Sequence, residues 1–332
     1  MSFSFAVIGA GAWGTAIANT LARLDKGKVI IWAKEKEVVS QINKENKNDI
    51  FLKGINLEKN IYATENLSEA LANYIFYVTP AQSFRQIINL QKNFINNNNK
   101  VIICSKGIEI SSGHLMSEIM NNELPNINYS ILSGPSFAHE VAGNMPAALV
   151  LASNNIKNAI DLSNFISSKN FRLYPSDDVV GVQVGGAIKN VYAISSGIVK
   201  GLNYGENARA ALLTRAISEM VRISIAFGGK KESIFGLSGV GDILLTCTSE
   251  ISRNFTLGKA IGQGKGLSTI LNTNNTIAEG YFTTKAIYNL VKSKNIDAPI
   301  LNSIYDILYK DANPREAAAS LLNRPLKNKE FY

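Results

Sequence analysis

The sequence predicts an α/β protein in which a doubly wound, Rossmann-type parallel sheet domain is followed by an all-helical C-terminal domain. In the first half, short apolar runs alternate with segments of helical periodicity, and a glycine-rich turn follows the first run. From about Asp178 onward nearly every segment has helical periodicity. The 332 residues correspond to about two domains. We place a nucleotide-binding domain at residues 1–180 and a helical substrate or catalytic domain at 181–332.

Six apolar runs are strand candidates, and they are continuous rather than alternating, as expected for strands covered on both faces. Between the first two runs, Ile17, Leu21 and Leu24 recur at helical spacing. This alternation of strand and helix implies parallel strands joined by right-handed crossovers. The predicted strands are residues 3–8, 29–32, 74–78, 101–104, 129–132 and 148–151.

Apolar residues recur at helical spacing along 286–291, 300–308 and 317–322. The last of these segments follows Asn313-Pro314, a preferred N-cap residue followed by proline at the first helical position. No Pro/Ser-rich linker precedes the helical half. The domain boundary is therefore a change of period near residues 175–190.

Composition excludes several classes of protein. A hydrophobic fraction of 46% excludes a disordered chain. Two cysteines, Cys104 and Cys247, exclude a disulfide-stapled secreted fold and a four-cysteine zinc site. No cluster with metal-ligand spacing is present, and no metal is expected. Glycines and polar residues interrupt the uncharged stretch from Met1 to Ala22, which argues against a signal peptide or membrane span. We expect a reduced, cytoplasmic protein.

The charge is basic but diffuse. Lys+Arg 34 against Asp+Glu 26 leaves a net charge of +8, which favours anionic partners. No block of like charges forms a patch for nucleic acid or for a membrane surface. A phosphorylated small molecule is therefore the favoured partner.

The string Gly9-Ala10-Gly11-Ala12-Trp13-Gly14 matches G-x-G-x-x-G, directly after a predicted strand and at the start of a predicted helix. In this context Gly9 permits a tight turn, Gly11 lets the backbone approach a pyrophosphate, and Gly14 lets the helix pack on the strand. The pyrophosphate would rest on the helix N-terminus. Trp13 is either a lid against the dinucleotide or ordinary surface packing.

Cofactor preference depends on the residues after the second predicted strand, Ala33, Lys34 and Glu35. An acidic side chain here binds the ribose of NAD, whereas a cation accommodates the 2′-phosphate of NADP. The small Ala33 and the cationic Lys34 favour NADP, with NAD tolerated through Glu35. An ordinary exposed lysine at position 34 is the alternative.

Lysine is the better candidate for proton transfer, because the only histidines, His114 and His139, lie in settings that do not suggest a base. Lys106 follows a predicted strand, at the edge of the sheet where ligands bind. Lys189 lies in Gly185-Gly186-Ala187-Ile188-Lys189-Asn190, which we interpret as a glycine-rich helix start facing the substrate. For each lysine, a solvated surface position is the alternative.

Two further groups lie downstream. Asp242 opens a predicted helix, and Thr246 follows it by one turn on the same face; a helix cap is an equal interpretation of Asp242. Ser252-Arg253-Asn254 combines a guanidinium, which binds phosphate bidentately, with a hydroxyl and an amide.

At this point the chain resembles the bacterial-type NAD(P)-dependent glycerol-3-phosphate dehydrogenases. The resemblance runs in order along nearly the whole chain, and its most specific strings are GGAIKN and LTCTS followed by SRN. Two departures are Lys34, where relatives often carry His or Arg, and Ala12, where they often carry Ser. The matching strings are GAGAWGTA (9–16), SKGIE (105–109), LSGPSFAHE (132–140), GVQVGGAIKNVYAI (181–194), GLNYGENARAALLTRAISEM (201–220), GVGDILLTCTSEISRN (239–254), and AEG with TTKA (278–286).

The resemblance implies reduction of dihydroxyacetone phosphate to sn-glycerol 3-phosphate with NAD(P)H, for phospholipid synthesis, by a homodimer. It implies that Lys189 handles the proton of the substrate oxygen, with Asp242, Thr246 and Lys106 beside the reaction. Substrate-binding residues would be Lys106, Gly134, Ser136, Lys189, Asp242, Ser252, Arg253 and Asn254. Cofactor-binding residues would be Gly9, Gly11, Ala12, Trp13, Gly14, Lys34, Lys106, Ala138, Arg253, Ile277 and Glu279.

Two alternatives remain open. Another two-domain hydroxyacid dehydrogenase would share the glycine turn, although SRN and GGAIKN favour a phosphorylated three-carbon substrate. A nucleotide-sensing protein without catalysis would share the fold, although Lys189, Asp242 and Thr246 argue against it.

Overall fold

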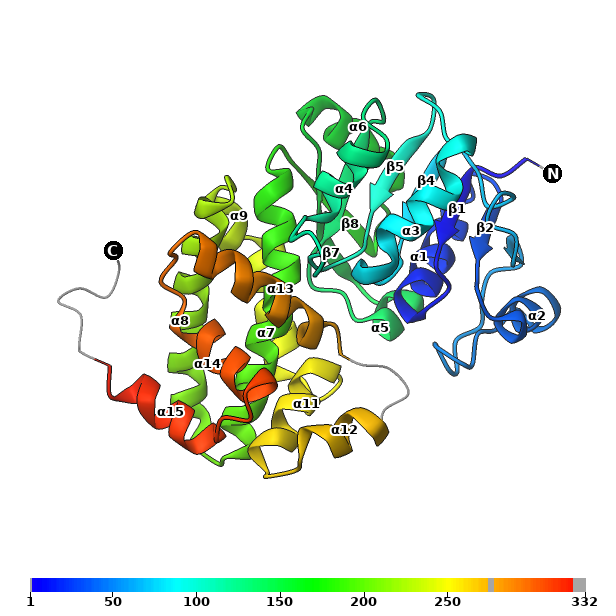
Figure 1. Cartoon of the computed structure of the whole chain (residues 1–332). Helices are drawn as coiled ribbons and strands as arrows, with labels where there is room; N and C mark the ends of the chain where they lie inside the picture. Colours follow the sequence, from blue (N-terminus) through cyan, green and yellow to red (C-terminus); the bar gives the residue numbers. More distant parts are fainter. Residues whose placement is uncertain (1, 274–277, 325–332) are drawn as a thin grey trace. The chain divides into compact units, whose positions relative to one another are not determined.

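The computed structural model describes residues 2–273 and 278–324, and the chain forms two compact units (Figure 1). The first unit comprises residues 1–106 and 114–179, and the second comprises residues 107–113 and 180–332. Segment 107–113 groups with the second unit through tertiary contacts, which local periodicity does not reveal. No helix within the described ranges is both long and apolar enough to cross a bilayer.

In the described part of the first unit, eight strands form one sheet in the order β3-β2-β1-β4-β5-β6-β7-β8. The first six strands pair parallel, and the order grows outward on both sides of β1, which confirms the doubly wound fold class. The strands are β1 (Phe5–Ile8), β2 (Val29–Trp32), β3 (Ile61–Thr64), β4 (Tyr74–Tyr77), β5 (Lys100–Ile103), β6 (Tyr129–Ser133), β7 (Ala147–Ala152) and β8 (Phe171–Ser176).

Helices cover both faces of this sheet. Consecutive residues of a strand point to opposite faces. Phe76 of β4 joins a core cluster with Ile17 and Leu162, whereas the ring of Tyr77 packs edge-on against Phe84, with ring centroids 5.7 Å apart. The helices of this unit are α1 (Ala12–Ala22), α2 (Lys36–Glu45), α3 (Ala81–Gln91), the short 3₁₀ helix η1 (Lys92–Phe94), α4 (Met116–Glu123), α5 (Ala138–Ala142) and α6 (Ile156–Ile166).

The last two strands run against the others, so the predicted parallel orientation is wrong for the strand at 148–151. β7 is antiparallel to β6, and β8 is parallel to β7. The connection from β6 to β7 contains only α5, which has five residues and spans about 8 Å. The five-residue β6 spans about 17 Å, and a parallel neighbour would require the connection to return over that length. Because α5 alone is too short for this, β7 runs antiparallel to β6.

β3 and β8 were not predicted, because neither is a continuous apolar run. In β3 only Ile61 is buried. In β8 buried and exposed residues alternate, and Pro175 interrupts the apolar pattern. Both are outer strands of the sheet, where one-sided burial is expected.

The described part of the second unit contains helices and no strand, which confirms the predicted all-helical class. The predicted cap of α15 is present: the Asn313 side chain accepts a hydrogen bond from Arg315 N at 2.9 Å, with Pro314 at the first helical position. The helices are α7 (Val179–Gly201), α8 (Gly205–Ala226), α9 (Lys231–Phe235), the π-helical turn η2 (Leu237–Gly241), α10 (Asp242–Thr248), α11 (Arg253–Gly262), α12 (Leu267–Thr273), α13 (Glu279–Ser293), α14 (Pro299–Tyr309) and α15 (Pro314–Leu322).

Helices α7 and α11 approach each other closely through glycines. A Cβ on Gly197 would lie 2.1 Å from the carbonyl oxygen of Phe255, and a Cβ on Gly258 would lie 2.0 Å from that of Ile194. Larger residues would therefore push the two helices apart. This contact fixes the start of α11, which carries Ser252-Arg253-Asn254, against the helix that carries Lys189.

Glu219 of α8 is fully buried and caps another helix of the second unit. Its carboxylate accepts hydrogen bonds from Ile300 N at 3.0 Å and Leu301 N at 2.9 Å, in the first turn of α14. It also accepts a hydrogen bond of 3.2 Å from the Tyr192 hydroxyl of α7. Burial raises the pKa of Glu219 to about 7, because desolvation of the charged form outweighs the backbone hydrogen bonds that favour it.

We expect the free energy of unfolding to fall as pH rises from 4.5 to about 7, because only the folded protein keeps the Glu219 proton in this window. The difference in pKa between the folded and unfolded states corresponds to roughly 3 kcal/mol. The side chain introduced by Glu219→Gln does not titrate. The free energy of unfolding of the wild type minus that of this variant should therefore decline across the window and level off above it. Urea unfolding followed by far-UV circular dichroism at a series of pH values measures this, and parallel pH curves would contradict it.

Candidate active site

The turn between β1 and α1 has the geometry that its glycine spacing predicts. Gly9 has a φ of +114°, a conformation that L side chains rarely adopt. A Cβ on Gly14 would lie 1.8 Å from the Gly9 carbonyl oxygen, so only glycine allows α1 to pack this closely on the turn. Beyond Gly11 itself and its two chain neighbours, no atom lies within 4 Å of the position that a Cβ on Gly11 would take. The backbone at Gly11 therefore borders open space that a bound group can fill.

The start of α1 suits an anion. Its first N–H groups carry the positive end of the helix dipole. The first turn contains no acidic side chain that would compete for these groups. The half-buried Ala12, the first residue of the helix, adds no bulk beyond a methyl group. A dinucleotide pyrophosphate therefore fits this turn.

The other predicted cofactor residues of the first unit lie at the sheet edge or on helices beside it. Trp13 is half-buried and packs against the core, and a lid over the dinucleotide stays a prediction. Lys34 and Glu35 follow β2 and are both exposed, so they are available to a ribose or to a 2′-phosphate. Ala138 begins α5, which packs on α1.

Lys106, Gly134 and Ser136 come together at the carboxyl ends of β5 and β6. The Lys106 ammonium donates a hydrogen bond of 3.2 Å to the Gly134 carbonyl oxygen, and the Ser136 hydroxyl donates one of 3.0 Å to the same oxygen. Gly134 has a φ of +149°, and a Cβ there would lie 2.9 Å from Leu149 Cα. A cation and a hydroxyl therefore meet at the sheet edge where ligands bind in such folds.

In the second unit, Lys189, Asp242 and Thr246 form one buried cluster. The Lys189 ammonium donates a hydrogen bond to Asp242 Oδ1 and forms an ion pair with it. The Thr246 hydroxyl donates to the same oxygen at 3.3 Å, as their spacing on α10 predicts. Lys189 is 8% exposed and Asp242 is fully buried. Asp242 thus does more than cap α10, because its carboxylate compensates a buried positive charge.

The predicted position of Lys189 at a helix start is wrong, since it lies in the interior of α7. The neighbouring glycines do not begin the helix. A Cβ on Gly185 would lie 2.6 Å from the Ser238 carbonyl oxygen. Gly185 therefore permits the close approach of the segment that leads into Asp242. This segment is the π-helical turn η2, a local geometry that is frequent at functional sites.

Ser252, Arg253 and Asn254 lie at the start of α11. Ser252 is the N-cap and accepts a hydrogen bond from Phe255 N at 3.3 Å. Arg253 is exposed. The buried Asn254 donates to Asn190 Oδ1 at 3.0 Å and accepts from Gly280 N at 2.9 Å.

Asn190 was not singled out from the sequence, although it directly follows Lys189. Its hydrogen bond with Asn254 ties the Ser252-Arg253-Asn254 triplet to α7. Glu279 is the first residue of α13. Ile277 lies outside the described residues.

Both cysteines are free and buried. Burial raises the pKa of the Cys247 thiol, which lies 4.0 Å from the Lys189 carbonyl oxygen. Burial also raises the pKa of the Cys104 thiol. Neither thiol is therefore a ready nucleophile. Among residues 2–273 and 278–324, no three His, Cys, Asp or Glu side chains gather in a way that could hold a metal ion.

Comparison with known families covers both units. Residues 4–159 match the model of the NAD-dependent glycerol-3-phosphate dehydrogenase N-terminus, and residues 178–319 match that of the C-terminus. The chain belongs to the NAD-dependent glycerol-3-phosphate dehydrogenase family. This confirms the resemblance inferred from the motifs.

Individual members of the glycerol-3-phosphate dehydrogenase family are similar along their full length. A glycerol-3-phosphate dehydrogenase [NAD(P)+] from Novosphingobium aromaticivorans is 42% identical over 98% of this chain and 98% of its own. One from Rhodospirillum rubrum is 44% identical over 97% of this chain and 93% of its own. The crystal structure of the Coxiella burnetii glycerol-3-phosphate dehydrogenase has 36% identity and a TM-score of 0.93, covering 97% of this chain and 99% of that chain.

Asp242→Asn tests the buried ion pair. This variant keeps the shape of the side chain but removes the charge that compensates the Lys189 ammonium, so we expect a loss of about 3–5 kcal/mol in the free energy of unfolding. Lys189→Met combined with Asp242→Leu removes both charges and should recover much of that loss. Urea unfolding of Lys189→Met, of Asp242→Leu and of the double variant gives the coupling energy of the pair. Strictly additive effects would exclude the pairing.

Proposed function

We propose that this protein catalyses the NAD(P)H-dependent reduction of dihydroxyacetone phosphate to sn-glycerol 3-phosphate, and the reverse oxidation. The family matches across both units support this activity. The observation that carries the chemistry is the buried Lys189–Asp242 pair, because a buried ammonium beside a carboxylate is a group able to exchange a proton with a substrate oxygen.

The first unit would hold the cofactor, whose nicotinamide supplies the hydride when bound. The pyrophosphate would lie at Gly9, Gly11, Ala12 and Gly14, where open space meets a helix N-terminus without acidic competitors. The exposed Lys34 would attract a 2′-phosphate, so we propose NADP(H) with NAD(H) tolerated. The further cofactor contacts proposed are Trp13, Lys106, Ala138, Arg253, Ile277 and Glu279.

Lys189 would be the acid–base group. As negative charge develops on the carbonyl oxygen of the substrate, its ammonium would donate a proton to that oxygen, and in the oxidation direction it would take the proton back. Asp242 Oδ1 would hold the ammonium in one orientation, and the Thr246 hydroxyl would hold that oxygen in place by donating a hydrogen bond to it.

Phosphate recognition would fall to two cations other than Lys189. Arg253 offers a planar fork of donors that matches a phosphate. Lys106, whose ammonium donates to the Gly134 carbonyl oxygen, would supply a second positive charge. Binding energy from the phosphate can then orient the reacting carbon. The other proposed substrate contacts are Gly134, Ser136, Ser252 and Asn254.

At the level of the cell, we propose a cytoplasmic homodimer that supplies glycerol phosphate for phospholipid synthesis. We propose residues 1–180 as the nucleotide-binding part and residues 181–332 as the substrate and catalytic part. The family membership and the location of the Lys189–Asp242 pair support this division.

The decisive experiment is oxidation of NADPH and of NADH by the purified protein, followed at the nicotinamide absorbance with dihydroxyacetone phosphate as substrate. We expect turnover with both nucleotides and a higher kcat/KM with NADPH. Binding of NADPH without turnover would indicate a nucleotide sensor. Turnover only with unphosphorylated 2-keto acids would indicate another hydroxyacid dehydrogenase.

Lys189→Ala should lower kcat by about 100- to 10,000-fold, the usual contribution of a general acid, with little change in the Kd of NADPH. Lys189→Arg is the matched control, because it retains a positive charge beside Asp242 but does not release its proton. Stopped-flow turnover and calorimetry separate the two effects. Full turnover in Lys189→Arg would remove Lys189 from proton transfer.

Arg253→Ala should raise the KM for dihydroxyacetone phosphate by about 10- to 100-fold, as expected for the loss of a charge-assisted hydrogen bond worth about 1.5–3 kcal/mol. Arg209→Ala serves as control, since Arg209 pairs with Glu206 on α8. Steady-state kinetics with substrate varied at saturating NADPH measures both. An unchanged KM in Arg253→Ala would mean that the phosphate binds elsewhere.

A further inference from the structure

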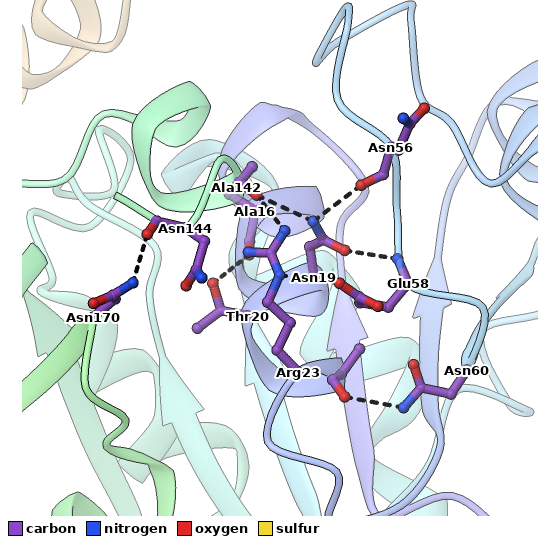
Figure 2. A network of polar contacts seen from close by, with 11 residues as sticks. Ala16, Asn19, Thr20, Arg23, Asn56, Glu58, Asn60, Ala142, Asn144 and Asn170 are labelled. Atoms are coloured by element: carbon purple, nitrogen blue, oxygen red, sulfur yellow. Dashed lines mark hydrogen bonds and ion pairs between the residues drawn. The ribbon is translucent and has the colours of Figure 1, made fainter. Parts of the chain in front are cut away.

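A segment of the first unit lies across the helix that follows the glycine turn. This segment, residues 46–60, connects α2 to β3, and we call it the strap. Its hydrogen bonds reach both α1 and the turn before it. Figure 2 shows the part of this network on α1, and the part on the turn is formed by Asn48.

Asn48 is fully buried, and its side-chain amide is satisfied on both ends. Its Nδ2 donates to the Ala10 carbonyl oxygen at 2.9 Å and to the Thr15 hydroxyl at 2.8 Å. The Thr15 hydroxyl in turn donates to the same Ala10 oxygen at 3.2 Å. Asn48 Oδ1 accepts from Phe51 N at 3.3 Å, which holds the amide in this orientation.

These bonds fix the peptide plane between Ala10 and Gly11. In a trans peptide the carbonyl and the following N–H point in opposite directions. When two donors hold the Ala10 oxygen toward the protein interior, the Gly11 N–H must point away from it. If this peptide plane rotated, the Ala10 carbonyl oxygen would face a bound phosphate instead, and the two negative groups would repel each other.

The strap also anchors α1 itself. Asn19, fully buried, donates to the Ala142 carbonyl oxygen of α5 at 3.2 Å and accepts from Glu58 N at 2.9 Å. Arg23 bridges the same two partners, with bonds of 2.7 Å to Ala142 O and 3.1 Å to Glu58 Oε1 (Figure 2). Both the turn and the helix are thus tied to one segment.

We propose that Asn48 is a positioning residue for cofactor binding, which holds the Ala10–Gly11 peptide so that the Gly11 N–H faces the pyrophosphate. This inference rests on the proposed cofactor site and adds to it a residue that does not touch the cofactor. A neutral amide suits the task, because it donates two hydrogen bonds without placing negative charge beside an anion site.

Asn48→Asp is the sharpest test. The substitution is nearly isosteric, but it replaces both N–H donors with an acceptor oxygen, and that oxygen attracts the Thr15 hydroxyl away from Ala10. The Ala10 carbonyl then loses both donors. Asn60→Asp is the matched control on the same strap, because Asn60 Nδ2 also donates to two carbonyl oxygens, those of Ala22 at 3.1 Å and Gly27 at 3.2 Å.

Calorimetry gives the Kd of NADPH and NADH for the full chain, and competition gives that of adenosine, which lacks a pyrophosphate. We expect Asn48→Asp to weaken both dinucleotides about tenfold or more, equivalent to about 1.4 kcal/mol, and to leave adenosine unchanged. Asn60→Asp should keep wild-type affinities even where its Tm falls. This contrast separates positioning of the turn from a general loss of stability.

Thr15 provides a second variant should Asn48→Asp not fold. Thr15→Val removes one donor to the Ala10 carbonyl oxygen and should weaken dinucleotide binding less than Asn48→Asp does. Thr15→Ser keeps the hydroxyl and should bind the dinucleotides with wild-type affinity. Equal losses for dinucleotides and adenosine, or equal losses in the Asn48 and Asn60 variants, would overturn the proposal. If the wild type binds neither dinucleotide, the proposed function itself is overturned. If the wild type binds them and the Asn48→Asp and Thr15→Val variants bind them with the same Kd, only the role of Asn48 is overturned.

Discussion

The burial of one positive charge constrains much of the helical unit. An ammonium that is 8% exposed, as at Lys189, costs several kcal/mol unless a carboxylate lies beside it. Asp242 reaches that place because Gly185 lets the Ser238 backbone approach α7 more closely than any side chain would allow. The π-helical turn then ends where α10 begins, with Asp242 as its first residue. Gly185 therefore serves the ion pair rather than the helix start that the spacing of glycines suggested.

The first unit meets a similar requirement with neutral groups. Asn19 and Asn48 are fully buried, and both amides are satisfied. Asn19 bonds to backbone groups of α5 and the strap, and Asn48 bonds to the glycine turn, the Thr15 hydroxyl and the strap. Charged side chains in these positions would need buried counter-ions and would alter the field at the helix N-terminus. Amides hold the turn without that cost. In the proposed function the glycine turn would bind an anion, beside which a neutral amide adds no negative charge, whereas Lys189 would exchange a proton.

Local signals predicted the parts of the site whose members are close in sequence. The glycine turn depends on the spacing of glycines over six residues, and the pairing of Asp242 with Thr246 depends on one turn of helix. Both features were therefore predictable from local sequence patterns. Asn254 meets Asn190 across 64 positions in the chain, and Asn48 meets Ala10 across 38; no periodicity reports such pairs. β3 and β8 were missed for a related reason, because outer strands lack the continuous apolar run of a strand buried on both faces.

The electrostatics of the proposed function divide between two kinds of cation. Lys189 is neutralised locally by Asp242, so this pair adds little net field for attracting a doubly charged phosphate from solution. Attraction must then come from cations nearer the solvent, of which Arg253 and Lys34 are exposed and which the diffuse charge of +8 supports. Such groups are screened by salt, whereas a buried pair is screened far less. In the proposed function, binding of the two phosphorylated ligands would therefore weaken with salt, whereas proton transfer by the buried pair would respond far less to it.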